Sequence, residues 1–279
     1  MNLIGIDLDG TLLNSEQKIS HKNAASLKSL SSDCFPFICS GREVGDIQAI
    51  LKEADLAIPA VGLNGAIGYD QDKLIFDFPF DPQAVKEVSQ IVSAFPTKIY
   101  TNQGSYESQN YQEGMKNIFY AIGQEFPVEE LNYELDYENT IQSTAYDAIE
   151  EIINQKNINV YKLFVFVPNR EIKKELFPQI ENIPNVSVTE SAAVNLEIVP
   201  RSVSKGFVFD HLSRIYELDQ PTKFAIGDSL NDLEMFKNAD ISFAMANGHP
   251  AIKELADHVT VSNDEDGVSQ ALAMIKGTR

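Results

Sequence analysis

Two aspartates close an apolar run at the start of the chain. Residues 3–6 (Leu-Ile-Gly-Ile) lead into Asp7 and, two positions later, Asp9. Such a run is typical of a buried parallel strand, whose carboxyl end meets the ligand-binding edge of an open α/β sheet. Side chains at i and i+2 of a strand share a face, so both carboxylates are expected on one side. A cation or a shared proton relieves their repulsion, and the spacing therefore predicts a divalent-metal site.

Two simpler interpretations of this motif have to be weighed. Asp and Gly favour turn conformations, so Asp-x-Asp-Gly also occurs in turns that have no function. The motif also begins like a calcium-binding loop, which requires Gly at its sixth position and Glu at its twelfth. Counting from Asp7, those positions hold Leu12 and Lys18, which excludes the calcium loop. A metal site and a simple turn remain the two alternatives for the motif taken alone.

A second carboxylate pair follows an apolar run near the other end of the chain. Residues 223–226 lead through Gly227 to Asp228, and Asp232 follows in the first turn of an expected helix. Ser, Asn and Asp commonly cap helices, so we expect Ser229 or Asn231 to be the cap. Capping does not explain Asp228, which ends a strand as Asp7 does.

The elements between these motifs alternate between strand-like and helix-like patterns. Apolar runs at 35–39 and 58–61 end in polar, glycine-containing segments, and helices are expected from Ser20 and over 44–54. Several apolar strands that each end in such a segment are typical of a parallel sheet whose loops gather at one edge.

The pattern changes after residue 81. Alternating strands (97–101 and 160–167) and helices expected at 82–95, 111–122, 143–154 and 170–180 indicate an inserted α+β domain. The first pattern returns with a strand at 196–199. We therefore expect an α/β protein with a Rossmann-like parallel-sheet core of residues 1–81 and 188–279 and an α+β insertion of residues 82–187.

Composition narrows the classes of partner. Hydrophobic residues make up 43% of the 279 residues, as in an ordinary globular protein, and the formal charge is −19. Nucleic acids and anionic membranes require a basic face, so neither is expected as a partner. We find no apolar run long enough to cross a bilayer and no secretory signal. Cys34 and Cys39 are expected to be reduced core residues, which favours a cytoplasmic location.

Four motifs follow one another along the chain: Asp7-Leu8-Asp9-Gly10-Thr11, Ser40-Gly41-Arg42, Lys205, and Gly227-Asp228-Ser229-Leu230-Asn231-Asp232. Together they resemble the motifs of the haloacid dehalogenase-like phosphatases, in the Cof-type branch with a large cap domain. The resemblance covers nearly the whole chain, including the position and size of the insertion. It implies magnesium-dependent hydrolysis of small phosphorylated metabolites, either sugar phosphates or phosphorylated cofactors such as pyridoxal phosphate.

The resemblance also implies catalytic roles. Asp7 would be the nucleophile that forms an aspartyl-phosphate. The Asp9 side chain would protonate the leaving oxygen and then take a proton from the attacking water. The expected Mg²⁺ ligands are the Asp7 carboxylate, the Asp9 backbone carbonyl and the acidic pair Asp228 and Asp232. Asp232 is alternatively expected to orient Lys205 or a metal-bound water.

Further residues of the motifs are expected to bind the phosphoryl group. Ser40 and the backbone amides near Gly10 and Gly41 would hold phosphoryl oxygens. The remaining candidates are Thr11, Arg42 and Asn231, the last of which could also orient the lysine. Lys205 would supply the positive charge opposite the metal, with Arg42 and Arg201 as alternatives for that task.

Two residues outside the main motifs keep a functional and a structural interpretation. Asn64 could contact substrate, or it could form a tight turn with Gly65. Lys162 could face the substrate from the insertion, or it could be an outward-facing lysine on a half-exposed strand. Two alternatives to a phosphatase also remain: a phosphotransferase or phosphomutase that passes the phosphoryl group to an alcohol, and a non-enzymatic metabolite-binding protein.

Overall fold

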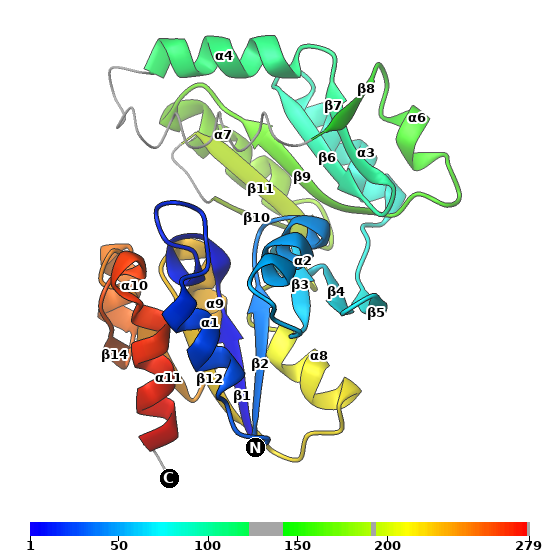
Figure 1. Ribbon diagram of the computed structural model, residues 1–279. Coiled ribbons are helices and arrows are strands. Elements are labelled where there is room, and N and C mark those ends of the chain that lie inside the picture. Colours follow the sequence, from blue (N-terminus) through cyan, green and yellow to red (C-terminus); the bar gives the residue numbers. More distant parts are fainter. Residues whose placement is uncertain (123–141, 191–193, 278–279) are drawn as a thin grey trace. The chain divides into compact units, whose positions relative to one another are not determined.

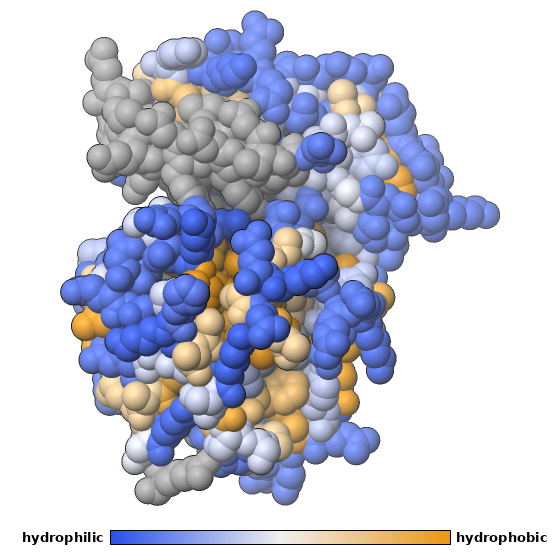
Figure 2. All heavy atoms as spheres, viewed as in Figure 1, coloured by the Kyte–Doolittle hydropathy of each residue, from blue (hydrophilic) through white to orange (hydrophobic). Residues whose placement is uncertain are grey.

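The computed structural model describes residues 1–122, 142–190 and 194–277. The chain divides into two compact units, one formed by Met1–Asp77 with Ser202–Arg279 and the other by Phe78–Arg201 (Figure 1). Within the described residues, no helix combines the length and the apolar character needed to cross a bilayer. Hydrophilic residues predominate on the face drawn in Figure 2, as the acidic composition leads one to expect.

The larger unit is built on an eight-stranded sheet whose central strands run parallel. The expected α/β class is confirmed, because parallel strands alternate with helices along the chain. An antiparallel hairpin completes one edge. In spatial order the strands are β14 (His258–Val259), β13 (Ile241–Ala244), β12 (Thr222–Gly227), β1 (Asn2–Ile6), β2 (Cys34–Cys39), β3 (Ala60–Gly62), β4 (Ile67–Asp70) and β5 (Lys73–Asp77).

Helices cover both faces of this sheet (Figure 1). On one face α8 (Val208–Ile215) and α9 (Leu233–Lys237) bury apolar side chains against β1 and β2. On the other face α1 (His21–Lys28) lies beside α11 (Gly267–Gly277), which it contacts through Ser26 and Ser269. The expected start of α1 is confirmed, because the Ser20 side chain accepts the N–H of Asn23 at 3.0 Å. The other core helices are α2 (Val44–Glu53) and α10 (Pro250–Leu255).

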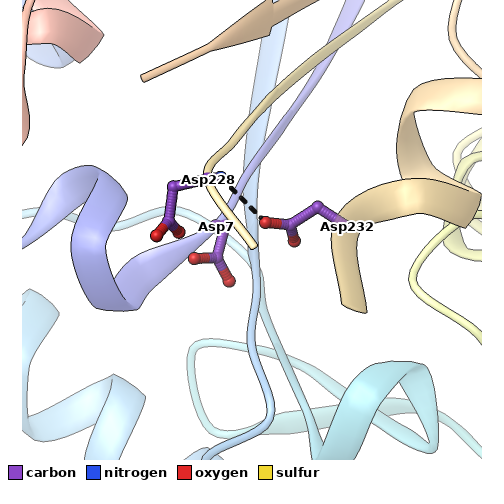
Figure 3. Close-up of side chains that lie close together, drawn as sticks. All are labelled: Asp7, Asp228 and Asp232. Atoms are coloured by element: carbon purple, nitrogen blue, oxygen red, sulfur yellow. Dashed lines mark hydrogen bonds between the residues drawn. The ribbon is translucent and has the colours of Figure 1, made fainter. Parts of the chain in front are cut away.

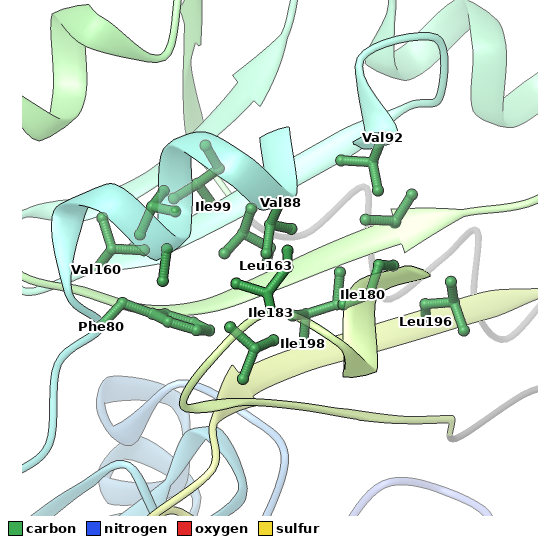
Figure 4. Packing of buried hydrophobic residues seen from close by; sticks show 14 of the residues in the cluster. Phe80, Val88, Val92, Ile99, Val160, Leu163, Ile180, Ile183, Leu196 and Ile198 are labelled. Atoms are coloured by element: carbon green, nitrogen blue, oxygen red, sulfur yellow. The ribbon is translucent and has the colours of Figure 1, made fainter. Parts of the chain in front are cut away.

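The smaller unit is an α+β structure with a six-stranded sheet. An apolar cluster fills the space between one face of this sheet and the helices α3 (Pro82–Val92) and α7 (Arg170–Glu181) (Figure 4). The strands in spatial order are β10 (Val186–Thr189), β11 (Asn195–Pro200), β9 (Val160–Phe166), β6 (Thr97–Thr101), β7 (Gly104–Ser108) and β8 (Ser143–Tyr146). Its helices are α3 (Pro82–Val92), α4 (Tyr111–Ile122), α6 (Glu150–Ile153) and α7 (Arg170–Glu181).

Two expectations from the sequence are corrected here. The strand at 196–199 belongs to the smaller unit, because β11 pairs antiparallel with β9 and β10, and the second boundary therefore lies after Arg201 rather than at 187/188. Residues 143–146 form the edge strand β8, paired with β7, where a helix was expected. In both cases hydrogen bonding to other strands decides which element forms and which sheet it joins, and a local sequence pattern does not predict that pairing.

The core of the smaller unit supplies a first prediction. Leu163 is fully buried in the cluster of Figure 4, so Leu163→Ala should lower the local free energy of unfolding by about 2–5 kcal/mol through lost contacts and a residual cavity. Native-state hydrogen exchange of the β9 amides measures this loss. Leu74→Ala, at a side chain that is 45% exposed, should change stability by no more than about 0.5 kcal/mol. Equal protection of β9 in the two variants would contradict the prediction.

Candidate active site

Three carboxylates converge at the carboxyl edge of the parallel sheet. Strands β1 and β12 are neighbours with Ile6 opposite Ile226, so the residues that follow them, Asp7 and Asp228, emerge side by side. Asp232, in the short helical turn after β12, completes the group. Each of the three offers an oxygen, and these oxygens lie within 4.8 Å of one another (Figure 3).

The chain after β1 makes a tight turn over Leu8–Leu12. Gly10 adopts a φ of +69°, and a Cβ there would lie 2.5 Å from Oδ2 of Asp228, so the close approach requires glycine. The hydroxyl of Thr11, which is fully buried, donates to Oδ1 of Asp228 at 3.1 Å. The Thr11 hydroxyl therefore orients a carboxylate, and the expected role of Thr11 in phosphate binding stays a prediction.

Lys205 links one carboxylate of each acidic motif, Asp7 and Asp232. Its Nζ donates to Oδ1 of Asp7 at 2.5 Å and to Oδ1 of Asp232 at 2.7 Å. A third hydrogen bond, at 3.2 Å, goes to Oδ1 of Asn231. The lysine is 1% exposed, so these bonds form away from water. Arg201, the alternative candidate for this charge, pairs with Glu181 in the smaller unit.

Asp232 uses both of its carboxylate oxygens inside the protein. Oδ1 accepts from Lys205, while Oδ2 accepts the backbone N–H groups of Asp228 and Ser229, each at 3.0 Å. Of the alternatives open from the sequence, this bonding favours a role in orienting the lysine over direct metal ligation. Asn231 acts in the same way, since its Oδ1 accepts from Lys205 and from the Ser229 hydroxyl.

Burial and crowding shift the protonation equilibria of these groups. Burial and the nearby Asp232 raise the pKa of Asp7 well above its usual range, against the opposing effect of Lys205. The same two causes raise the pKa of Asp228 to about 7. Burial alone would lower the pKa of Lys205, but the charges of Asp232 and Asp7 outweigh it and raise that pKa. Asp7 and Asp228 therefore resist losing their protons, and the ammonium form of Lys205 is favoured.

A divalent cation fits this set of donors. With Asp7, Asp228 and Asp232 ionised and Lys205 protonated, the cluster carries three negative charges and one positive charge, a formal −2. Carboxylate and carbonyl oxygens are the ligands that Mg²⁺ prefers. Asp7 and Asp228 could hold such an ion, together with the backbone carbonyl of Asp9 in the same turn.

The Asp9 side chain forms an ion pair that the sequence did not predict. Nε and Nη2 of Arg42 both donate to its carboxylate, with Nε to Oδ2 at 2.8 Å, and Nη2 also donates to Gln17. The Asp9 side chain is 34% exposed and so remains partly open to solvent. Arg42 is thus the partner of the expected acid–base group, and its expected contact with phosphate stays a prediction.

The Ser40 and Asn64 loops lie against each other at this edge of the sheet. The buried hydroxyl oxygen of Ser40 accepts the N–H of Arg42 at 3.2 Å, across the intervening Gly41. The N–H of Asn64 donates to the Ser40 carbonyl at 2.9 Å. Asn64 is buried with a φ of +60°, so it also forms the turn that its structural interpretation requires.

Lys162 lies in the smaller unit and is not an outward-facing surface residue. It is 3% exposed, and its Nζ is 3.0 Å from Oε2 of Glu197, which is equally buried. The half-exposed interpretation is therefore wrong. The sequence did not suggest Glu197 as a partner, because its strand had been placed in the wrong sheet.

The raised pKa of Asp228 predicts a pH dependence of the metal-free protein. The pKa of Asp228 is about 7 in the folded state and 3.8 in its ordinary state, so the folded protein binds a proton at Asp228 more tightly than the unfolded chain does. The stabilisation that this proton contributes to the folded state is fully present below about pH 4 and is lost as the pH rises through 7. Asp228→Asn removes the group. In chelator, the Tm of the wild type should therefore fall between pH 5 and pH 8 by several degrees more than that of the variant, at about 2–4 °C per kcal/mol. Parallel Tm curves would contradict the prediction.

Comparisons with known proteins agree with this geometry. A family model described as haloacid dehalogenase-like hydrolase matches residues 4–272. The chain is 29% identical to the Bacillus subtilis 5-amino-6-(5-phospho-D-ribitylamino)uracil phosphatase YwtE, with 96% of each chain covered. It is 27% identical to phosphatase YwpJ of the same organism, with 98% of this chain and 99% of YwpJ covered. A solved haloacid dehalogenase-like hydrolase from B. subtilis superposes with a TM-score of 0.84 at 27% identity, covering 98% of this chain and 99% of that one. The chain belongs to the haloacid dehalogenase-like hydrolases and is a phosphatase, an enzyme that hydrolyses phosphoric monoesters.

Proposed function

We propose that this enzyme hydrolyses small phosphomonoesters in a magnesium-dependent reaction through an aspartyl-phosphate on Asp7. The observation that carries the proposal is the position of the Asp7 carboxylate. It is buried at the carboxyl end of β1, bonded to Lys205 through Oδ1 and beside Asp228. A carboxylate can approach a phosphate only where positive charge surrounds both groups. When bound between Asp7 and Asp228, Mg²⁺ would supply that charge and neutralise the phosphoryl oxygens.

The first chemical step forms the covalent intermediate. An Asp7 oxygen attacks phosphorus, the bond from phosphorus to the ester oxygen breaks, and its electron pair stays on the departing oxygen. Asp9 donates a proton to that oxygen, which leaves as an alcohol. Lys205 holds the Asp7 side chain in place during the attack, since its Nζ already bonds Oδ1.

The second step restores the enzyme. Water attacks phosphorus, Asp9 accepts the proton that the water loses, and the bond from phosphorus to Asp7 breaks to release inorganic phosphate. Arg42, which donates to the Asp9 carboxylate, would orient that side chain toward the reacting oxygen. Ser40 and the backbone amides near Gly41 and Gly10 would bind the phosphoryl oxygens in both steps.

The substrate is proposed to be a small phosphorylated metabolite, with a sugar or sugar-alcohol phosphate favoured. Support comes from YwtE, a relative named for a substrate that carries a phosphate on a ribityl chain. The smaller unit, including Lys162 and Glu197, would serve as a cap that selects the organic part of the substrate. The free Cys34 and Cys39 support a cytoplasmic location.

Asp7→Asn tests the proposal directly. The amide is no nucleophile, so phosphate release from a panel of sugar phosphates, nucleotides and phosphorylated cofactors should fall on the order of 10³-fold or more, with the fold retained. Asp55→Asn is a matched control, because Asp55 is exposed and pairs with Lys28 on the surface. Magnesium-independent release, or an unaffected Asp7→Asn variant, would reject the mechanism. A phosphorylated alcohol appearing when an acceptor is added would indicate transfer in place of hydrolysis.

Asp9→Asn separates the two steps. p-Nitrophenolate leaves without protonation, so the variant should still show a burst of p-nitrophenol equal to the enzyme concentration. Steady turnover should fall by about 10²–10⁴-fold, because no group takes the proton from the attacking water. Rapid mixing with p-nitrophenyl phosphate measures both phases. Loss of the burst together with turnover would remove Asp9 from the assigned role.

A further inference from the structure

The turn that follows β13 holds the end of β12 in place. The N–H of Met245 donates to the Gly227 carbonyl at 3.0 Å, and the N–H of His249 donates to the Asp228 carbonyl at 2.7 Å. The backbone that carries Asp228 is therefore fixed to this turn.

The same turn also holds the loop that carries Asp7 and Asp9. Nδ2 of Asn247 donates to the Gly10 carbonyl at 2.8 Å, and its Oδ1 accepts the N–H of Asn263 at 3.0 Å. Nδ2 of Asn263 in turn donates to the Leu13 carbonyl at 2.9 Å. Two linked carboxamides thus fix both ends of the Gly10–Leu13 segment, which contains the threonine bonded to Asp228.

We infer that Asn247, supported by Asn263, is a positioning residue that sets the spacing between the Asp7 loop and Asp228, and through it the affinity for the divalent cation. The inference rests on the proposed function. Among the described residues, the side chains of Asn247 and Asn263 bond to backbone groups and not to a carboxylate of the cluster. A carboxamide suits the task because it offers a donor to one carbonyl and an acceptor to one N–H at a fixed separation.

The expected effect follows from the demands of the ion. Mg²⁺ requires near-ideal octahedral geometry at short distances, so a small change in ligand spacing weakens binding. Residues that orient metal ligands from outside the coordination sphere typically contribute about 10–100-fold in affinity or activity. Asn247→Ala removes both of the asparagine's bonds without adding charge, and we expect it to raise the Kd for Mg²⁺ about 10-fold.

The smaller unit offers a matched control. Nδ2 of Asn102 donates to the Asn157 carbonyl at 3.0 Å, and its Oδ1 accepts the N–H of Asn159 at 2.7 Å. Asn102→Ala therefore removes the same two kinds of bond from an exposed asparagine with no link to the carboxylates. A merely structural role for Asn247 would make the two variants behave alike.

The test is calorimetric titration of Mg²⁺ into the chelator-treated full chain without substrate, followed by kcat and KM at saturating Mg²⁺ and by Tm. The inference predicts a higher Kd for Mg²⁺ and a lower kcat with little change in KM for Asn247→Ala, and wild-type Kd and kcat for Asn102→Ala.

Asn263→Ala should act in the same direction and replaces Asn247→Ala if that variant does not fold. A wild-type Kd in the Asn247 and Asn263 variants would overturn the inference alone. A wild type that binds no Mg²⁺ would overturn the proposed function as well.

Discussion

The buried ammonium of Lys205 between Asp7 and Asp232 is the interaction on which the rest of the site depends. Removing one partner of a buried ion pair commonly costs about 3–5 kcal/mol, because the remaining charge is left without water or counterion. Forming it requires β1 and β12 to be neighbours, so that Asp7, 198 positions from the lysine, and Asp232, 27 positions from it, reach the same ammonium. It also requires a close approach at Gly227, where a Cβ would lie 2.6 Å from Asp232. The parallel sheet thus serves as the frame for one buried network of charges.

The charge balance of that network explains how a protein with a formal charge of −19 can act on an anion. Long-range repulsion is screened beyond about 8 Å at physiological salt, so local groups decide binding. The cluster leaves a formal −2 that a divalent cation would neutralise, and the Asp9–Arg42 pair adds no net charge. The raised pKa values of Asp7 and Asp228 have the same origin: carboxylates held together in a buried place. In the proposed mechanism, affinity for cation and phosphate is therefore a property of this edge of the sheet.

Much of the fold and of the candidate site could be predicted from the sequence, for physical reasons. Apolar strands that end in acidic residues mark the carboxyl edge of a parallel sheet, and so the pattern places Asp7 and Asp228 without any coordinates. The sequence around Lys205 carries no such local signal, and only its place between the other motifs indicates a functional role. The Asp9–Arg42 pair and the Asn247–Asn263 link depend on loops that meet only in three dimensions. The polar turn after the strand at 241–244 was the available signal for Asn247. A strand pattern also does not say which sheet a strand joins, which is why β11 was misplaced.

The proposed mechanism depends most directly on the covalent intermediate at Asp7. An aspartyl-phosphate is reduced by borohydride to homoserine, whereas a free aspartate is not. Enzyme quenched during turnover, reduced and digested should therefore yield a peptide from residues 1–18 with homoserine at position 7, and enzyme without substrate should not. Homoserine at another aspartate, or none at any position while phosphate is being released, would contradict the assignment of Asp7 as the nucleophile.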